Sequence, residues 1–226
     1  MLFAAGFGTR MGAMTKTQPK PMIKVAGRPL VDHALDIVDA AGFTQRVLNL
    51  HYLGDQIARH VWGRDVTLSW ETGTILDTGG GLRAAIPLLR DSPVMTINTD
   101  AVWTGRNPLT ELAEAWSDDQ MDALLLLAST QKALAFEGPG DFITDVAGRI
   151  SRANGKPGLA YLGAQIVRTD LLAEFVQSAF SINLLWDRLI ERGRVYGLIH
   201  SGSWCDVGRP EGIALAEAML AKSCDD

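Results

Sequence analysis

Glycines and one arginine cluster in a short segment near the start of this 226-residue chain. Residues 4–12 have the sequence AAGFGTRMG and follow a brief apolar run. Glycines in such a turn let backbone N–H groups approach an anion closely, and the start of a helix or turn adds a favourable field. The segment is therefore a candidate phosphate-binding loop. The alternative interpretation is a tight turn between two core elements.

Two common phosphate-binding loops do not fit this segment. The dinucleotide fingerprint G-x-G-x-x-G has Met11 where its third glycine should be, and His51 and Tyr52 stand where its acidic residue is expected. A Walker A loop needs a glycine before its lysine, and Lys16 follows Thr15. The sequence thus disfavours an NAD-dependent oxidoreductase and a P-loop enzyme.

A lysine between two prolines is the second notable feature. Pro19 and Pro21 hold Lys20 in an extended segment and remove backbone donors on either side of it. A lysine fixed in this way resembles a positioned cation, although a solvated lysine in a proline turn is the more common case. Farther along the chain, Asp100 closes an apolar run and Asp206 lies in a late loop. Each of these aspartates, taken alone, is interpreted as a helix or turn cap.

Apolar runs alternate with helical patterns along the chain. This alternation predicts a single α/β domain over residues 1–226, with three layers and a mostly parallel, Rossmann-like sheet. In such sheets ligands bind beyond the carboxyl ends of the strands. The segment 136–150 is less regular and is interpreted as a hairpin or an edge strand. The expected strands are 1–5, 46–50, 66–70, 93–98, 123–128, 159–167 and 194–199, and the expected helices are 29–41, 55–62, 78–89, 108–116, 182–192 and 210–221.

The composition excludes several classes of protein. Twenty-six acidic against 21 basic residues give a net charge of −5, which disfavours a nucleic-acid partner. No apolar run approaches the roughly 18 residues of a membrane helix, and no signal peptide is evident, so we expect a cytoplasmic protein without a membrane partner. Cys205 and Cys224 cannot build a disulfide framework or a four-thiolate zinc site. Because the sequence begins inside an expected strand, we expect the natural chain to start slightly upstream.

The two basic motifs together resemble the signature of the sugar-1-phosphate nucleotidyltransferase family, A-A-G-x-G-T-R-M followed by P-K-P. Further motifs occur in the family's order. Residues 78–81 (TGGG) resemble its base-recognition and helix-start segment, residues 97–100 (INTD) resemble its N-G-D motif, and residues 204–208 (WCDVG) match its W-x-D-V-G motif. Thr99 departs from the pattern, because members commonly have glycine there. Its side chain beside a metal ligand puts the local geometry in question.

The resemblance implies Mg²⁺-dependent transfer of a nucleotidyl group from a nucleoside triphosphate to a sugar-1-phosphate, on a GT-A-like fold. Positioning and charge neutralisation dominate such phosphoryl transfer. Arg10 would grip the β- and γ-phosphates, Lys20 would neutralise the attacking phosphate, and Asp100 and Asp206 would share Mg²⁺. The N-terminal half would bind the nucleotide and the C-terminal half the sugar phosphate. The expected nucleotide-binding residues are Ala5, Gly6, Gly8, Thr9, Thr78, Gly79 and Asn98.

The acceptor is indicated by residues 140–142 (GDF), which resemble a segment near the sugar in short uridylyltransferases that join UTP to N-acetylmuramate-1-phosphate in cell-wall recycling. Asp141 and Gly163 are therefore predicted to face the sugar phosphate, although Asp141 as a turn residue is the alternative. Guanylyl transfer to mannose-1-phosphate and thymidylyl transfer to glucose-1-phosphate stay open. So does a non-catalytic nucleotide-sugar-binding module. We expect a monomer or small homo-oligomer, without a C-terminal β-helix, because the chain ends soon after Gly208.

Overall fold

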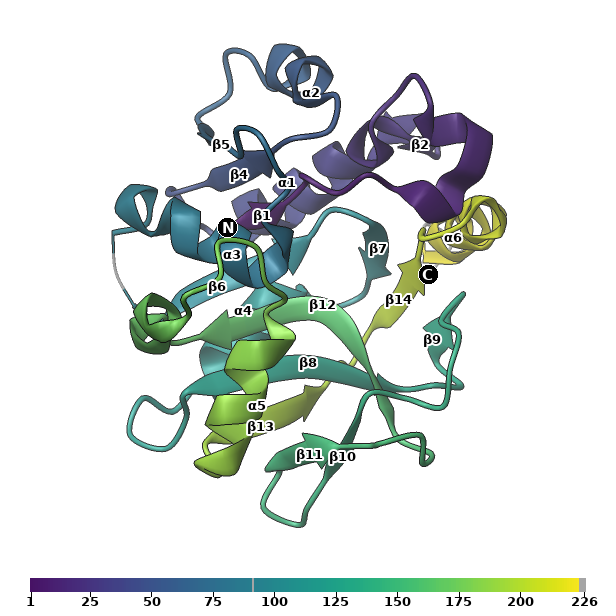
Figure 1. Ribbon diagram of the computed structural model, residues 1–226. Coiled ribbons are helices and arrows are strands. Elements are labelled where there is room, and N and C mark those ends of the chain that lie inside the picture. Colours follow the sequence, from purple (N-terminus) through teal and green to yellow (C-terminus); the bar gives the residue numbers. More distant parts are fainter. Residues whose placement is uncertain (91, 224–226) are drawn as a thin grey trace.

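The computed structural model describes residues 1–90 and 92–223, and a twisted mixed sheet forms its centre (Figure 1). The strand order is β11-β10-β12-β6-β1-β4-β5, with β8 on the other side of β12 and β13 beside β8. The strands of this sheet are β1 (Leu2–Phe3), β4 (Val47–Leu50), β5 (Thr67–Trp70), β6 (Val94–Asn98), β8 (Ala123–Ser129), β10 (Phe142–Thr144), β11 (Ile150–Arg152), β12 (Leu159–Val167) and β13 (Val195–Ile199).

The sheet is an α/β sheet as predicted, but it is mixed and not mostly parallel. Strands β5, β4, β1 and β6 run parallel to one another, as do β8 and β13. Strand β12 runs antiparallel to both β6 and β8. The connection from β8 to β12 holds the β10–β11 hairpin and no crossover helix, so β12 can return alongside β8 in the opposite direction. Of the two alternatives for 136–150, the structure shows a hairpin, but it spans residues 142–152 and its second strand, β11, forms an edge of the sheet.

Helices cover both faces of the sheet, which gives the predicted three layers (Figure 1). The side chains of β8 alternate between the two faces of the sheet. Leu124 and Leu126 pack into the hydrophobic core on one face, and Leu125 and Leu127 pack into the core on the other. Because both faces are buried, the whole strand is apolar. Among the described residues, no helix combines the length and apolar character needed to cross a membrane. The helices are α1 (Leu30–Ala40), α2 (Gly54–His60), α3 (Asp77–Ala85), α4 (Pro108–Ala115), α5 (Asn183–Glu191) and α6 (Pro210–Ser223).

A small second sheet was not predicted from the sequence. It has the order β7-β14-β9, from β7 (Ala101–Thr104), β14 (Ser203–Asp206) and β9 (Ala133–Leu134). Strands β7 and β14 pair antiparallel, so residues about a hundred positions apart in the chain become neighbours. A two-stranded hairpin, β2 (Lys24–Val25) with β3 (Arg28–Pro29), completes the sheets. Cys205 is a buried free thiol in β14, and Cys224 lies outside the described residues.

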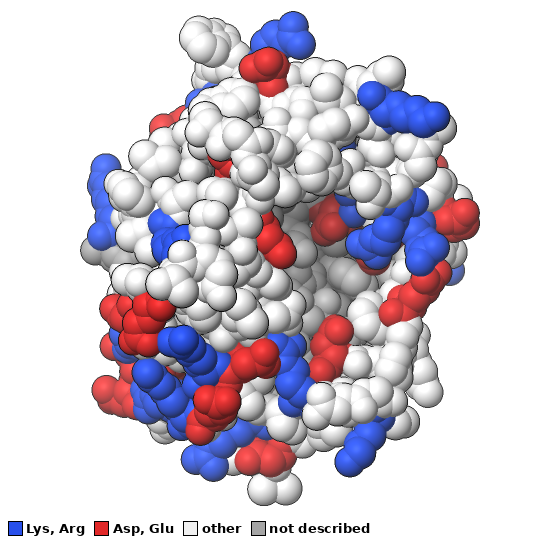
Figure 2. Space-filling view, in the orientation of Figure 1, with Lys and Arg blue, Asp and Glu red and all other residues white. Residues whose placement is uncertain are grey.

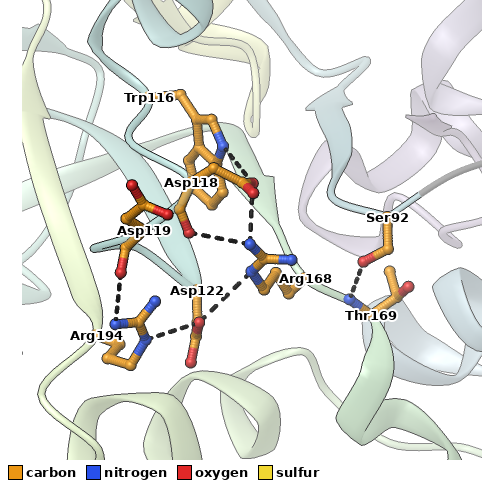
Figure 3. Close-up of polar contacts among 8 residues, drawn as sticks. All are labelled: Ser92, Trp116, Asp118, Asp119, Asp122, Arg168, Thr169 and Arg194. Carbon is orange, nitrogen blue, oxygen red and sulfur yellow. Dashed lines mark hydrogen bonds and ion pairs between the residues drawn. The ribbon is translucent and has the colours of Figure 1, made fainter.

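An ion cluster joins three strands of the main sheet where β8 and β13 begin and β12 ends (Figure 3). Asp122 Oδ1 accepts from Arg194 Nε at 2.9 Å and lies 3.6 Å from Arg168 Nε. Arg168 also pairs with Asp118 at 2.9 Å, and Arg194 donates to the carbonyl of Asp119. The side chain of Asp122 is only 14% exposed, so this carboxylate is the shared partner that water reaches least.

We expect Asp122→Asn to lower the free energy of unfolding by about 1 kcal/mol, because two arginines then share a neutral partner. For a chain of this size the melting temperature would fall by about 2–4 °C in thermal unfolding followed by circular dichroism. The matched control is Asp65→Asn, since Asp65 is 90% exposed in its ion pair and should have no measurable effect. Equal melting temperatures for Asp122→Asn and the wild type would contradict this prediction.

Candidate functional site

Two adjoining cavities lie at the carboxyl ends of β1, β4 and β6, where an α/β sheet is expected to bind ligands. The first cavity measures about 280 Å³ and extends from the glycine loop at residues 4–12 to the start of α3. The second measures about 330 Å³ and shares Arg10, Asn98 and Asp100 with the first. Figure 2 shows this face of the molecule hollowed near its centre, with acidic and basic side chains at the rim.

The glycine loop forms one wall of the first cavity. Gly8 has φ +63°, and a Cβ at this position would lie 2.9 Å from Cβ of Lys20, so a glycine lets the loop fold closely over that lysine. Its carbonyl accepts from the N–H of Met11 and opens a short 3₁₀ helix, Thr9–Thr15. The five loop residues predicted from the sequence all line the first cavity, namely Ala5, Gly6, Gly8, Thr9 and Arg10, and Ala4 lines it as well.

Lys20 is a positioned cation and not a solvated surface lysine. Its side chain is 10% exposed, and Nζ lies 2.7 Å from Oδ2 of Asp100. Pro19 is extended, with φ −69° and ψ 146°, and a single 3₁₀ turn begins at Lys20 itself. The proline-flanked segment therefore directs the ammonium group to the end of β6, and Lys20 lines the first cavity.

The β7–β14 pairing brings the two predicted metal ligands to one place. Asp206 is paired with Ala101, the neighbour of Asp100, and the N–H of Val207 donates to the carbonyl of Asp100 at 2.8 Å. Both aspartates line the second cavity. Arg10 completes the group, because NH1 lies 3.7 Å from Oδ2 of Asp206. Four charged side chains from distant parts of the chain thus meet where the two cavities join.

The two carboxylates differ in protonation behaviour. Burial, together with the negative charge of Asp100, raises the pKa of Asp206 to about 6. Burial also acts to raise the pKa of Asp100, but the charge and hydrogen bond of Lys20, with the charge of Arg10, hold it below its usual value. The nearby positive charges therefore do not fully offset the cost of holding ionised Asp206 in the folded protein.

A hard divalent cation fits this pair of carboxylates. Mg²⁺ typically takes one or two protein carboxylates and completes its coordination with phosphate oxygens and water. Within residues 1–90 and 92–223 no cluster of three or more His, Cys, Asp or Glu could hold a metal. Asp100 and Asp206 would thus need a phosphate-bearing substrate to supply further ligands, which matches their place between two cavities.

The extra side chain of Thr99 has a clear place beside these ligands. Its hydroxyl donates to the carbonyl of Phe3 at 2.7 Å, and its N–H donates to the same carbonyl at 3.3 Å. Thr99 is buried and links the end of β6 to β1. The departure from glycine at this position therefore reinforces the edge of the sheet on which Asp100 is held.

The glycine run at the start of α3 serves packing, which corrects one prediction. Thr78 lines the first cavity, but Gly79 is buried and is not among the lining residues, and its N–H donates to the carbonyl of Phe180 at 2.9 Å. A Cβ on Gly79 would lie 2.5 Å from the Phe180 ring, and one on Gly80 would lie 2.4 Å from the carbonyl of Ser178. These glycines allow the 178–180 segment to pack against α3.

The two residues predicted to face a sugar phosphate are placed differently. Gly163, with φ +83°, lines the second cavity, and a Cβ there would lie 2.8 Å from the side-chain amide of Asn98. Asn98 itself lines both cavities. Asp141 is not among the residues that line either cavity. Its Oδ2 accepts the N–H of Tyr161 at 2.8 Å, so it supports the cavity wall through β12.

Sequence reasoning missed two buried polar residues in the first cavity, Asn49 and Glu71. Asn49 interrupts the apolar strand β4, and Glu71 directly follows β5. A polar residue inside or at the carboxyl end of an apolar strand was the signal that could have identified them. Thr78 of the predicted base-recognition segment lines this cavity, and so do Ile75 and Asp77 just before it.

Comparison with known proteins agrees with this architecture. Residues 1–169 match the model of the MobA-like NTP transferase domain. The chain is 36% identical to an N-acetylmuramate alpha-1-phosphate uridylyltransferase of Caulobacter vibrioides, over 99% of this chain and 97% of that protein. It is 32% identical to a protein of the same name from Neisseria meningitidis, over 97% and 96% of the two chains. The structure of HddC from Yersinia pseudotuberculosis, complexed with GMP-PN, shares the fold with a TM-score of 0.80, 21% identity and 97% coverage of both chains.

The opposite pKa shifts predict opposite effects of neutralising the two aspartates in metal-free buffer. The native state disfavours ionised Asp206, so at pH 7.5 Asp206→Asn should raise stability by about 1 kcal/mol, or about 2–4 °C in melting temperature. This gain in stability should vanish near pH 4, where Asp206 of the folded wild type is already protonated and neutral. Asp100→Asn should instead cost about 2 kcal/mol at pH 7.5, because Lys20 loses its partner.

Differential scanning calorimetry of the two variants and the wild type at both pH values checks this prediction. A lower melting temperature for Asp206→Asn at pH 7.5 would show that its carboxylate is needed for folding and would contradict the prediction.

Proposed function

Because the chain belongs to the MobA-like NTP transferase family, we propose that it transfers a uridylyl group from UTP to N-acetylmuramate-1-phosphate, releasing pyrophosphate. The observation that supports this most directly is the convergence of Arg10, Lys20, Asp100 and Asp206 at the junction of the two cavities. The named activity of the Caulobacter vibrioides relative, which matches this chain over nearly its whole length, supports the choice of substrates.

The charges of the site favour one placement of the substrates. The triphosphate lies along the glycine loop, where the backbone approaches closely and Arg10 offers a planar fork to the phosphates. The nucleoside then extends toward α3 in the first cavity. The sugar phosphate occupies the second cavity beside Asn98 and Gly163. The N-terminal half of the chain thus binds the nucleotide, and the C-terminal half contributes most of the sugar side.

In the proposed reaction an oxygen of the sugar phosphate attacks the α-phosphorus, a new P–O bond forms, and the bond from the α-phosphorus to the bridging oxygen breaks. Lys20 brings a fixed positive charge to the reacting phosphates, and Arg10 neutralises the departing pyrophosphate. Mg²⁺ held by Asp100 and Asp206 would supply charge neutralisation for the same phosphates. Asp100 also orients Lys20 through the 2.7 Å ion pair.

We infer the setting of the reaction from its chemistry. A nucleoside triphosphate and a sugar phosphate are cytoplasmic metabolites, and the product is an activated cell-wall sugar, which supports a cytoplasmic role in cell-wall sugar recycling. The net charge of −5 supports small-molecule substrates over a nucleic-acid partner. We propose Mg²⁺ as the cofactor and a monomer or small homo-oligomer as the working form.

Lys20→Ala should lower kcat by about 10²–10³-fold while changing the KM for UTP by less than about threefold, because its charge matters most as charge develops on the reacting phosphates. Steady-state pyrophosphate release measures both parameters. Lys16→Ala is the matched control, since Lys16 lies on the same segment and is exposed. A wild-type kcat for Lys20→Ala would remove this lysine from the mechanism.

The function itself is tested by pyrophosphate release across a grid of nucleoside triphosphates and sugar-1-phosphates, with Mg²⁺ and with EDTA. We expect release from UTP with N-acetylmuramate-1-phosphate, and none with EDTA. Release from GTP with mannose-1-phosphate, or from dTTP with glucose-1-phosphate, would keep the reaction class and overturn the substrates. Nucleotide binding without release from any pair would indicate a binding module.

A further inference from the structure

A continuous chain of hydrogen bonds crosses the floor of the first cavity. The N–H of Ala4, at the root of the glycine loop, donates to Oδ1 of Asn49 at 2.8 Å. Nδ2 of Asn49 donates to Oε1 of Glu71 at 2.7 Å, and Oε2 of Glu71 accepts the N–H of Leu76 at 2.8 Å. Asn49 is 3% exposed and Glu71 4%, so water contributes little to these bonds. These hydrogen bonds connect the glycine loop to the segment that begins α3.

The Glu71 end of this hydrogen-bond chain follows β5, whereas the ion pair of Lys20 with Asp100 lies after β6, three strands away. Arg10 and Lys20 mark the phosphate end, and Glu71 lies with Ile75 and Thr78 among the lining residues beyond it. A triphosphate bound at the cations leaves its nucleobase beside residues 71–78. We call residues 72–78 the base wall.

The order of donors and acceptors along the chain is fixed. Asn49 must turn its oxygen to Ala4, because a backbone N–H can only donate, and this directs its NH₂ group to Glu71. Leu76 also presents an N–H, so Glu71 faces a donor on each side. A side chain with two acceptor oxygens satisfies both donors, whereas a glutamine would turn its own NH₂ toward one of them.

The surroundings leave the pair no freedom to move. A Cβ on Gly81 would lie 2.6 Å from Oε1 of Glu71 and 3.0 Å from Nδ2 of Asn49, so α3 packs directly on the pair. The base wall is held from its other side too, because the N–H of Phe180 donates to the carbonyl of Leu76. The next residue, Asp77, has φ +59°, a conformation that persists in a non-glycine residue only where its surroundings impose it.

We propose that Asn49 and Glu71 are positioning residues that set the distance between the phosphate loop and the base wall, and that through this distance they determine affinity for the nucleotide and selection of its base. This inference rests on the proposed function, because it assumes a nucleoside triphosphate in the first cavity. The pair need not touch the reacting phosphates. It acts by keeping the base wall at the separation that one base fits.

Exchange of the amide and the carboxylate tests the proposal. Glu71→Gln places one N–H against another, and we expect the KM and Kd for UTP to rise about tenfold or more, with kcat at saturation within about threefold of wild type. The preference for UTP over the other triphosphates should shrink.

The double variant Asn49→Asp/Glu71→Gln restores every bond of the chain. The new carboxylate at position 49 accepts from the N–H of Ala4 and from the new amide at position 71, and the oxygen of that amide accepts from the N–H of Leu76. We expect the double variant to regain wild-type KM and base preference within about threefold.

Two further variants complete the design. Gly81→Ala forces the pair apart without changing its chemistry and should raise the Kd for UTP as Glu71→Gln does, which keeps the test decisive if Glu71→Gln does not fold. Asp122→Asn is the matched acid-to-amide control at the ion cluster of Figure 3, and it should change the melting temperature but not the KM for UTP.

Binding of UTP with Mg²⁺, measured by titration calorimetry without an acceptor, separates this proposal from the proposed function. A wild type that binds UTP but releases no pyrophosphate would overturn the reaction and leave the positioning proposal to be judged on Kd alone. Wild-type affinity and base preference in folded Glu71→Gln would overturn the positioning role. A double variant no better than Glu71→Gln would overturn it equally.

Discussion

The partly buried ion pair between Lys20 and Asp100 is the contact on which the arrangement of the site depends. A lysine shielded from water needs a charged partner at hydrogen-bonding distance, and Asp100 at 2.7 Å provides it. This requirement fixes the proline-flanked segment against the end of β6. The glycine loop then folds over Lys20, and the β7–β14 pairing adds Asp206 beside Asp100. One electrostatic constraint thus draws four separate segments to the junction of the two cavities.

Close packing of backbone against side chains sets the remaining dimensions of the site. Gly8 lets the glycine loop approach Lys20, Gly163 lets β12 approach Asn98, and Gly81 lets α3 approach the Asn49–Glu71 pair. In each case a methyl group would lie within about 3 Å of the neighbour, which is tighter than packed side chains tolerate. These glycines act as spacers between rigid elements, and the walls of both cavities are consequently held in place from several directions.

Much of this molecule followed from its sequence, and the exceptions have physical causes. Helices and long strands were predicted because their apolar periodicity spans many residues, as in α1 and β8. Strands β7, β9 and β14 are only two to four residues long and carry no such period. The direction of β12 depends on its tertiary neighbours. Lys20, Asp100 and Asp206 were identified by motif, whereas Gly79 and Asp141 matched motifs but serve packing and wall support.

The pairing of β7 with β14 has a consequence for how the protein comes into being on the ribosome. Arg10, Lys20 and Asp100 leave the exit tunnel long before Asp206, which follows Asp100 by about a hundred residues. The small sheet cannot close until β14 has emerged. A nascent chain therefore carries the glycine loop and Lys20 well before it has the carboxylate of Asp206. The four charged side chains can therefore meet only after translation has passed β14.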